Sequence, residues 1–166
     1  MSEDPIILRN YRFADADWLT ALHGALYAQA DGFDDTFAPL VGDILAQFAR
    51  HHDPSRERGW VAQRGEDRLG SIFCVDNGEN IAKLRLFLVA PETRGQGLGF
   101  RLLQACVNFA RDAGYTHLTL WTHESHKAAC ALYARCGFAL ESSKPVHSFG
   151  VDLVEQTWSR DLKTPL

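Results

Sequence analysis

The spacing of apolar residues changes several times along the chain, and each change predicts a boundary between a helix and a strand. Apolar positions three and four residues apart predict four helices, each beginning or ending near a polar or glycine residue. The first is expected to follow Asp15 and to stop around Asp31-Gly32, and the others are expected at about 36–51, 97–113 and 125–137. Asp15 and Ser125 precede two of them and are predicted as helix N-caps.

Short apolar runs between the helices predict strands. They lie at 6–12, 60–64, 69–75, 81–89, 118–121, 138–141, 146–153 and 157–162. Polar turns containing glycine join the runs between 60 and 89 and favour hairpins. A helix connects 81–89 to 118–121, so these two strands are expected to be parallel neighbours. The predicted fold is α/β: a mixed, mostly antiparallel sheet of about seven strands with helices on both faces.

Length and charge restrict the class of protein. The 166 residues fit one domain, predicted over 1–166, which can bury roughly 70% of its unfolded surface. A net charge of −4 argues against a nucleic-acid partner held by a broad basic face. No apolar run approaches the roughly 20 residues of a membrane helix, and the start at Met1 carries no secretory signal. We therefore expect a cytoplasmic protein with no membrane partner.

The cysteines give the same expectation. The four residues, Cys74, Cys106, Cys130 and Cys136, form no Cys-x-x-Cys pair, and in a cytoplasmic protein they are expected to be reduced. Cys106 and Cys130 fall on apolar helical positions, so we interpret them as core residues rather than nucleophiles.

A glycine-rich turn lies between the strand 81–89 and the following helix. Its sequence is Arg94-Gly95-Gln96-Gly97-Leu98-Gly99. Glycines let backbone amides approach a ligand, and the helix N-terminus adds free N–H groups and partial positive charge, so the turn is suited to a phosphate or pyrophosphate. Phe100 stands where a dinucleotide fingerprint requires glycine, and no Lys-Ser/Thr pair follows Gly99 as in a P-loop.

Two motifs in this order resemble the hallmarks of the GNAT acetyltransferase superfamily. The first is Arg-Gly-x-Gly-x-Gly after Val89-Ala90-Pro91, and the second is Leu132-Tyr133-Ala-Arg-Cys-Gly137-Phe138. The resemblance covers essentially the whole chain and implies the same mixed fold, in which the strands 81–89 and 118–121 splay apart. It also implies acetyl-coenzyme A as co-substrate.

The resemblance assigns a role to each matching residue. Pantetheine would pair with the main chain of Phe87, Leu88 and Val89, and the amide of Leu88 or Phe87 would polarise the thioester carbonyl. Tyr133 would donate a proton to the departing sulfur, or else pack in the core. The pyrophosphate would be held by the loop and the helix start: Arg94, Gly95, Gln96, Gly97, Leu98, Gly99 and Phe100.

The chain departs from the family pattern at two points. Many members carry a glutamate base on the strand equivalent to 81–89, but this strand contains no carboxylate. The open candidates are His123, Glu124, His147 or a water relay. His126 stands where the family often has an asparagine that contacts the cofactor, and we assign it that contact. Without a thiolate or carboxylate pair beside His123 and His126, no metal is expected.

Charge near the strand 81–89 bears on the acceptor. If Lys83 and Arg85 face the cleft, they favour a small amine that also carries an acidic group; the alternative is that both cations are solvated or ion-paired. The acceptor site is expected around the end of the first helix, where one group of residues clusters, although its acids could equally be helix caps. The group is Tyr27, Asp31, Phe33, Asp34 and Asp35.

The tail gives a narrower resemblance. Residues 147–158, with 82–86 and 23–27, look like the acetyltransferase half of bacterial proteins that fuse it to a MarR-type regulator. The sequence thus predicts an acetyl-CoA-dependent N-acetyltransferase acting on a primary amine of a small molecule or peptide, by direct attack in a ternary complex. The alternative is a non-catalytic acyl-CoA-binding regulatory module. A homodimer and a separate regulator both stay open.

Overall fold

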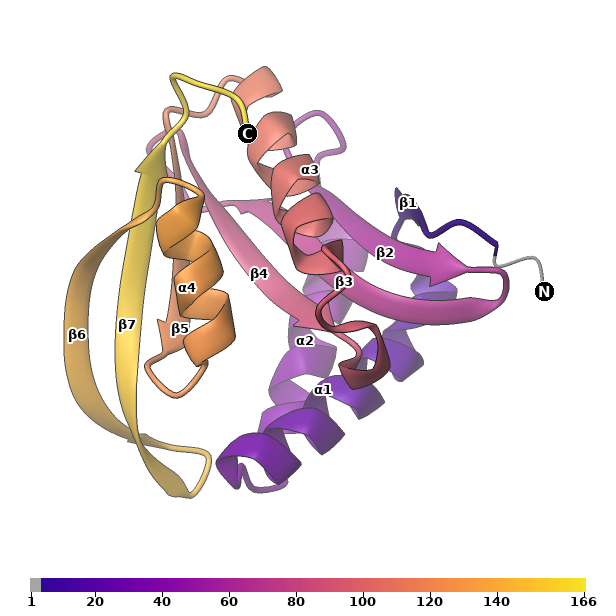
Figure 1. The fold of residues 1–166 in the computed structure, drawn as a ribbon, viewed down its shortest axis with the longest axis vertical. Coiled ribbons are helices and arrows are strands. Elements are labelled where there is room, and N and C mark those ends of the chain that lie inside the picture. The colour runs from indigo at the N-terminus through magenta and orange to yellow at the C-terminus, as the bar shows by residue number, and fades with distance from the viewer. Residues whose placement is uncertain (1–3) are drawn as a thin grey trace. The chain divides into compact units, whose positions relative to one another are not determined.

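A computed structural model describes residues 4–166 (Figure 1). Residues 1–3, which belong to the segment predicted to carry no secretory signal, lie outside the described part. The helices are η1 (Phe13–Asp15), α1 (Ala16–Asp31), α2 (Phe37–His51), η2 (Pro91–Thr93), α3 (Leu98–Asp112) and α4 (Lys127–Arg135). The strands are β1 (Ile7–Asn10), β2 (Arg58–Arg64), β3 (Asp67–Asp76), β4 (Ile81–Val89), β5 (His117–His123), β6 (Ala139–Ser148) and β7 (Val151–Asp161).

The strands form a seven-stranded mixed sheet in the order β1-β2-β3-β4-β5-β7-β6. The pairs β1–β2, β2–β3, β3–β4 and β6–β7 are antiparallel. The pair β4–β5 is parallel, with Ile81 opposite His117 and Lys83 opposite Thr119. The predicted mixed sheet, and the parallel pairing across the third long helix, are confirmed.

The chain divides into two compact units, each described by itself. The first contains residues 4–11, 54–119 and 161–166. In it α3 packs against β3 and β4, because its apolar stripe repeats every three to four residues (Figure 1). The fully buried side chains of this core include Val61, Ile72, Phe73, Leu102, Leu103 and Leu118. This helix and these strands carry the glycine-rich turn.

The second unit contains residues 12–53 and 120–160. Its helices α1 and α2 contact each other, and Leu19, Val41 and Leu45 are buried. The long β6–β7 hairpin and α4 belong to the same unit. Tyr133 of α4 lies in its core, 4% exposed.

The predicted strand breaks in the tail are wrong. We expected strands to end near 141 and 153, but β6 and β7 run on as two long strands that turn at Phe149-Gly150. Pro145 does not interrupt β6, because β6 is an edge strand and an edge tolerates the missing N–H. Phe149 and Gly150 have φ of 54° and 78°, the positive values that a two-residue hairpin turn requires.

Two predicted N-caps also act differently. The Asp15 carboxylate makes no cap bond to α1; it is buried and accepts a hydrogen bond from the Arg12 N–H at 2.8 Å. Position 126 takes the N-cap of α4, and the Ser125 hydroxyl instead donates to Asp31 at 2.8 Å. The Asp15 carboxylate binds an amide only three residues earlier, whereas Ser125 binds a carboxylate 94 residues away that local sequence does not reveal.

The four cysteines are free thiols. Cys106 is fully buried, as expected of a core residue, and its Sγ lies 3.8 Å from the Phe73 carbonyl. Cys130 is only partly buried, with its Sγ 3.6 Å from Gln156 Oε1. Burial raises the pKa of the Cys106, Cys130 and Cys136 thiols, so these groups are held in the protonated form.

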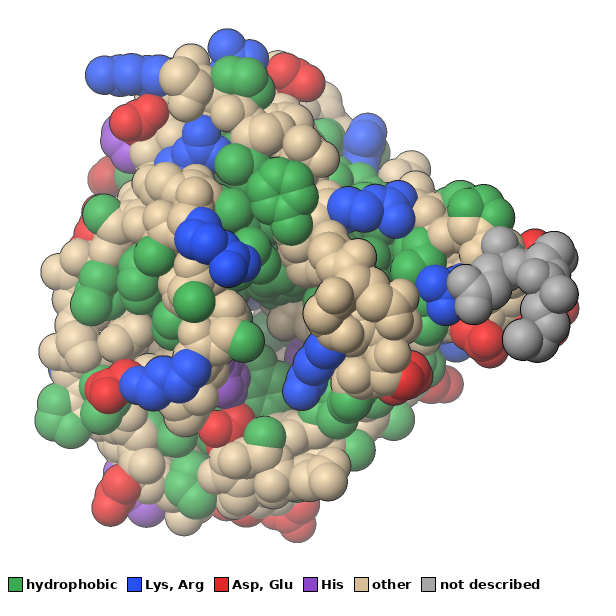
Figure 2. All heavy atoms as spheres, in the orientation of Figure 1, with side chains coloured by type: hydrophobic (Ala, Val, Ile, Leu, Met, Phe, Trp, Pro, Cys, Tyr) green, Lys and Arg blue, Asp and Glu red, His purple; other side chains and the backbone are tan. Residues whose placement is uncertain are grey.

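On the face drawn in Figure 2, Lys and Arg side chains are scattered among acidic and apolar ones. Cationic charge of the described residues does not gather into one broad area of that face. None of the helices in residues 4–166 combines the length and the apolar character needed to cross a bilayer.

Candidate active site

The glycine-rich turn is open on its outer side. Gly95 and Gly97 have φ of 80° and 79°, a conformation that glycine adopts without strain. A Cβ built on either residue would meet no heavy atom within 4 Å. The turn is anchored beneath by Leu98, which is 2% exposed, while Arg94 is exposed beside it. The turn therefore leaves space for a ligand directly above its backbone.

The start of α3 supplies donors toward that space. Gly97 is the N-cap, and the Arg101 N–H makes the first helical bond, to the Gly97 carbonyl at 3.1 Å. The amides of Leu98, Gly99 and Phe100 precede that bond and have no carbonyl acceptor within the helix. Free amides and the helix dipole together favour an anion such as a phosphate.

The strand before the turn contains a bulge that the sequence did not predict. Ser71 pairs with Leu88 and Phe73 with Arg85, so two residues of β4 oppose Ile72 alone. Leu86 has a φ of 50°, and its carbonyl accepts a hydrogen bond from the Ser71 hydroxyl at 2.6 Å. A bulge leaves one residue out of the ladder and redirects those beyond it. A simple alternation of side chains between the two faces of β4 therefore holds only as far as Arg85.

The bulge adds Ser71 to the residues that shape the site. Nothing in the local sequence marked this serine, because its partner lies 15 residues away on the neighbouring strand. Beyond the bulge, Leu88 is 7% exposed, while Phe87 and Val89 are partly buried. These are the three residues whose main chain is predicted to pair with pantetheine.

Tyr133 lies in the core of the second unit. Its ring centroid is 5.7 Å from that of Phe138 and 6.3 Å from that of Trp158. The Tyr133 ring thus packs in the core, which was the alternative to catalysis. Its role as a proton donor stays a prediction.

His126 is part of a hydrogen-bonded cluster with Asp31 and Ser125. Its Nε2–H donates to Asp31 Oδ2 at 2.8 Å, and the Asp31 side chain is 5% exposed. The Ser125 hydroxyl donates to the second oxygen of the same carboxylate. The Nδ1 atom of His126 lies 3.5 Å from the Thr122 hydroxyl. With Nε2 engaged, Nδ1 is the atom left for the predicted cofactor contact, which stays a prediction.

The three protein candidates for the general base differ in their surroundings. Glu124 is exposed and lies 3.4 Å from the Lys127 ammonium. His147 is also exposed and donates to Asp152 at 2.8 Å. His123 is partly buried, and burial, followed by the nearby His126, lowers its pKa, so its imidazole is neutral at pH 7. Of the three, only His123 combines partial burial with a neutral ring.

The residues expected around the acceptor form two groups that Phe33 joins, because its ring lies 5.3 Å from that of Tyr27 and it also lines the pocket described below. Tyr27 and Asp31 face His126, with the Tyr27 and His126 rings 5.0 Å apart. Burial, with a smaller contribution from Asp31, raises the pKa of Tyr27 to about 12. Asp34 and Asp35 instead line a pocket of about 520 Å³.

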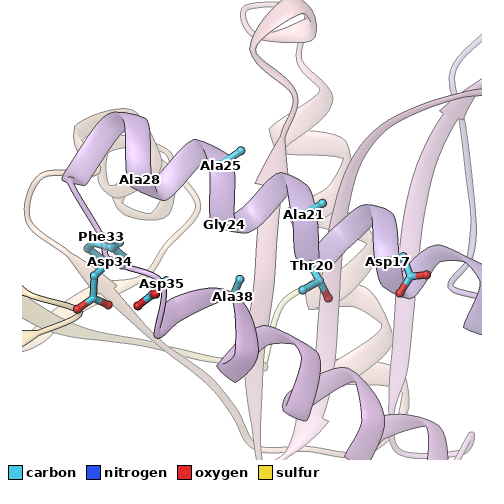
Figure 3. Close-up of a pocket in the computed structure, with 10 residues that line it drawn as sticks. All are labelled: Asp17, Thr20, Ala21, Gly24, Ala25, Ala28, Phe33, Asp34, Asp35 and Ala38. Atoms are coloured by element: carbon cyan, nitrogen blue, oxygen red, sulfur yellow. The ribbon is translucent and has the colours of Figure 1, made fainter.

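This pocket lies between α1 and α2 (Figure 3). Small residues of the two helices, such as Gly24 and Ala38, form its walls, with Asp17 at one end and Asp34 and Asp35 at the other. Hydrogen bonds from the Thr36 side chain and backbone lower the pKa of Asp34. Within the described residues, no group of three or more His, Cys, Asp or Glu side chains is arranged to hold a metal ion.

The sheet, the bulged strand and the open turn define an α/β protein in which the start of α3 is suited to an anion. The acetyltransferase (GNAT) family model matches residues 19–138, and the chain belongs to this family.

Two relatives illustrate the similarity in sequence. N-acetyltransferase 8B of Rattus norvegicus is 33% identical over 100 residues, which cover 57% of this chain and 45% of that protein. Mycothiol acetyltransferase of a Nocardioides species is 35% identical over 123 residues, covering 74% of this chain and 36% of that protein. The chain spans less than half the length of either relative.

Solved structures share the fold at low identity. An acetyltransferase of the GNAT family from Staphylococcus aureus Mu50 has a TM-score of 0.79 at 18% identity, covering 96% of this chain and 100% of that one. The yncA protein of Salmonella typhimurium, whose structure contains acetyl-CoA, has a TM-score of 0.78 at 17% identity, covering 98% of this chain and 97% of that one. These likenesses establish the GNAT fold.

Proposed function

We propose that the protein transfers an acetyl group from acetyl-CoA to a primary amine of a small molecule or peptide. The observation that carries this proposal is the open turn, where two glycines with positive φ precede a helix start with free amides. Family membership supports acetyl-CoA as the ligand. The pyrophosphate would lie on the amides from Gln96 to Phe100, with Arg94 adding charge, and pantetheine along Phe87–Val89.

The proposed chemistry is a single displacement in a ternary complex. The neutral amine attacks the thioester carbonyl, the C–N bond forms, and the C–S bond breaks. The amide of Leu88 or Phe87 stabilises the charge on the carbonyl oxygen. The departing sulfur takes a proton from the Tyr133 hydroxyl, and His123 or water removes the proton that the amine loses.

A non-catalytic acyl-CoA-binding module is the second candidate. The absence of a carboxylate from β4, visible in its sequence Ile-Ala-Lys-Leu-Arg-Leu-Phe-Leu-Val, favours it. The cytoplasmic location, the single domain over 1–166, the homodimer and the likeness to MarR fusions stay predictions from sequence.

Thiol release from acetyl-CoA across a panel of amines, arylamines and amino acids tests the proposal. We expect turnover with one acceptor class and a fall of about 100-fold in kcat for Tyr133→Phe, the lower end for loss of a general acid. Phe keeps the ring contacts, so coenzyme A affinity measured by calorimetry should not change.

Tyr115→Phe is the matched control, because Tyr115 is equally buried and donates to the Arg56 carbonyl outside the proposed site. It should keep full turnover. Equal turnover of wild type and Tyr133→Phe would leave Tyr133 a packing residue. Tight coenzyme A binding without thiol release from any acceptor would favour the binding module.

A further inference from the structure

Arg85 occupies the position in β4 immediately before the bulge. It pairs across the ladder with Phe73, and the next residue, Leu86, has the positive φ and the carbonyl bond to Ser71 described above. The backbone that carries Arg85 is therefore fixed by a strand pair on one side and by a side-chain hydrogen bond on the other.

The side chain of Arg85 belongs to the sheet face opposite α3. Cys74 interacts with Cys106 of α3, and Leu84 pairs with Cys74, so both face that helix. Neighbouring residues alternate between faces, which puts Arg85 and Phe73 on the other side. The ring centroids of Phe73 and Tyr11 lie 5.0 Å apart, so the surroundings of Arg85 on this face are partly aromatic. Lys83, two residues earlier on β4, shares this face.

The guanidinium of Arg85 is partly buried, yet across residues 4–166 it makes no hydrogen bond or ion pair. Burial alone lowers the pKa of this group. Arg56, in contrast, donates to the Ala113 carbonyl at 2.7 Å and to Asn80 at 2.8 Å, and its guanidinium stacks on Tyr115. Partial burial weakens the hydration of this cation, and no protein acceptor among the described residues replaces the lost water.

A carboxylate is the natural partner for such a group. The arginine fork matches two carboxylate oxygens and gains strength from the low local dielectric. A strand rises about 3.3 Å per residue, so Arg85 lies roughly 7–10 Å along β4 from the Phe87 and Leu88 amides. An extended arginine side chain can bring its guanidinium closer to these amides. The remaining distance can then match the separation between the carboxylate and the amine of an amino acid.

We propose that Arg85 binds the carboxylate of the acceptor, so that the acceptor is an amino-acid-like amine rather than a polyamine. This inference rests on the proposed N-acetyltransferase function and names its substrate class. Lys83 on the same face is 5% exposed and interacts with other residues of the protein, so Arg85 alone carries the inference.

The test compares acceptors that differ only in the carboxylate. We would measure kcat/KM for a panel of L-amino acids and for their amides, with spermidine as the polycation, in wild type, Arg85→Gln and Arg85→Lys. Arg111→Gln, at the exposed end of α3, is the matched control. Wild type should prefer the acid over its amide by at least tenfold, and Arg85→Gln should reduce that ratio to near one, mainly through KM.

Arg85→Lys should keep part of the preference, because it retains charge but not the fork, and Arg111→Gln should keep all of it. An unchanged acid-to-amide ratio in Arg85→Gln, an equal loss for both acceptors, or a preference of wild type for spermidine would overturn the inference. If no acceptor is acetylated, the proposed function fails instead. Calorimetric binding of L-amino acids to the coenzyme A complex then tests Arg85 alone: binding by wild type that Arg85→Gln loses supports it, and no binding overturns it.

Discussion

His23 shows how a single buried side chain links the fold to pH. It lies in α1, 2% exposed, with its Nδ1 2.9 Å from the Leu19 carbonyl. Its Nε2 is buried without a hydrogen-bond partner among residues 4–166. Burial outweighs the bond to Leu19 and lowers the pKa of His23 from 6.5 to about 4. The ring is therefore neutral in the folded protein at neutral pH.

This pKa predicts acid destabilisation. The unfolded chain takes up a proton near pH 6.5, whereas the folded chain resists it until about pH 4. The free energy of unfolding should fall by about 1.4 kcal/mol per pH unit across that window, about 3 kcal/mol in all. Urea unfolding of wild type and His23→Gln at pH 7, 5.5 and 4.5 measures it: the variant should lose this slope, and His117→Gln, at an exposed site, should keep it. Parallel slopes for all three proteins would exclude His23 as the source.

Individual contacts are the part of the site least visible in the sequence. The helix-start glycines were recognised because their spacing is local. The Asp31–His126 pair was not, since its members are 95 residues apart. The sequence places Asp31 near the acceptor and His126 at the position of an asparagine, but it does not link the two residues. Only the tertiary fold brings them together, because a single sequence does not indicate which residues far apart along the chain are in contact.

At the scale of the element, the turn into α3 offers a matched pair of glycines. Gly97 and Gly78 both have positive φ, 79° and 85°, and a Cβ on either meets nothing within 4 Å. Alanine at either position should cost about 1–2 kcal/mol of stability through backbone strain. Only Gly97→Ala should weaken coenzyme A binding, at least tenfold by calorimetry, because its methyl group enters the space above the turn. Equal coenzyme A affinity of the two variants would contradict a phosphate site there.

Helices and strands were predicted well where one rule dominates. Apolar periodicity gave α2 and α3 within one residue at each end and β4 at its full length, Ile81–Val89. It failed in β6, whose residues are mostly exposed, and in β7, where two of the buried alternate positions are the polar residues Gln156 and Arg160. The bulge at Leu86 was not predicted either, because leucine has no preference for positive φ. The hydrogen bond from Ser71 to the Leu86 carbonyl is also not local.

At the scale of the whole molecule, the two compact units share strands. The boundary between residues 119 and 120 falls within β5, and that between 160 and 161 falls within β7. In both places the chain passes from one unit to the other inside a strand, without a linker. We therefore expect one cooperative transition in scanning calorimetry, with equal calorimetric and van't Hoff enthalpies. Two resolved transitions would show that the units fold separately and would count against a single domain.

Strand order was predictable at this scale for a different reason. A helix between two strands supplies the crossover that a parallel pair requires, and this rule placed β4 beside β5. The position of β7 between β5 and β6 does not follow from any local rule.

The protonated cysteines have a practical consequence for following coenzyme A release. Chromogenic disulfide reagents react with the thiolate, so cysteines that burial keeps protonated consume reagent slowly. The early colour then comes from the product, while the slow reaction of the fully buried Cys106 records how often the native core opens. A single colorimetric assay would thus report both the turnover and the lifetime of the folded state.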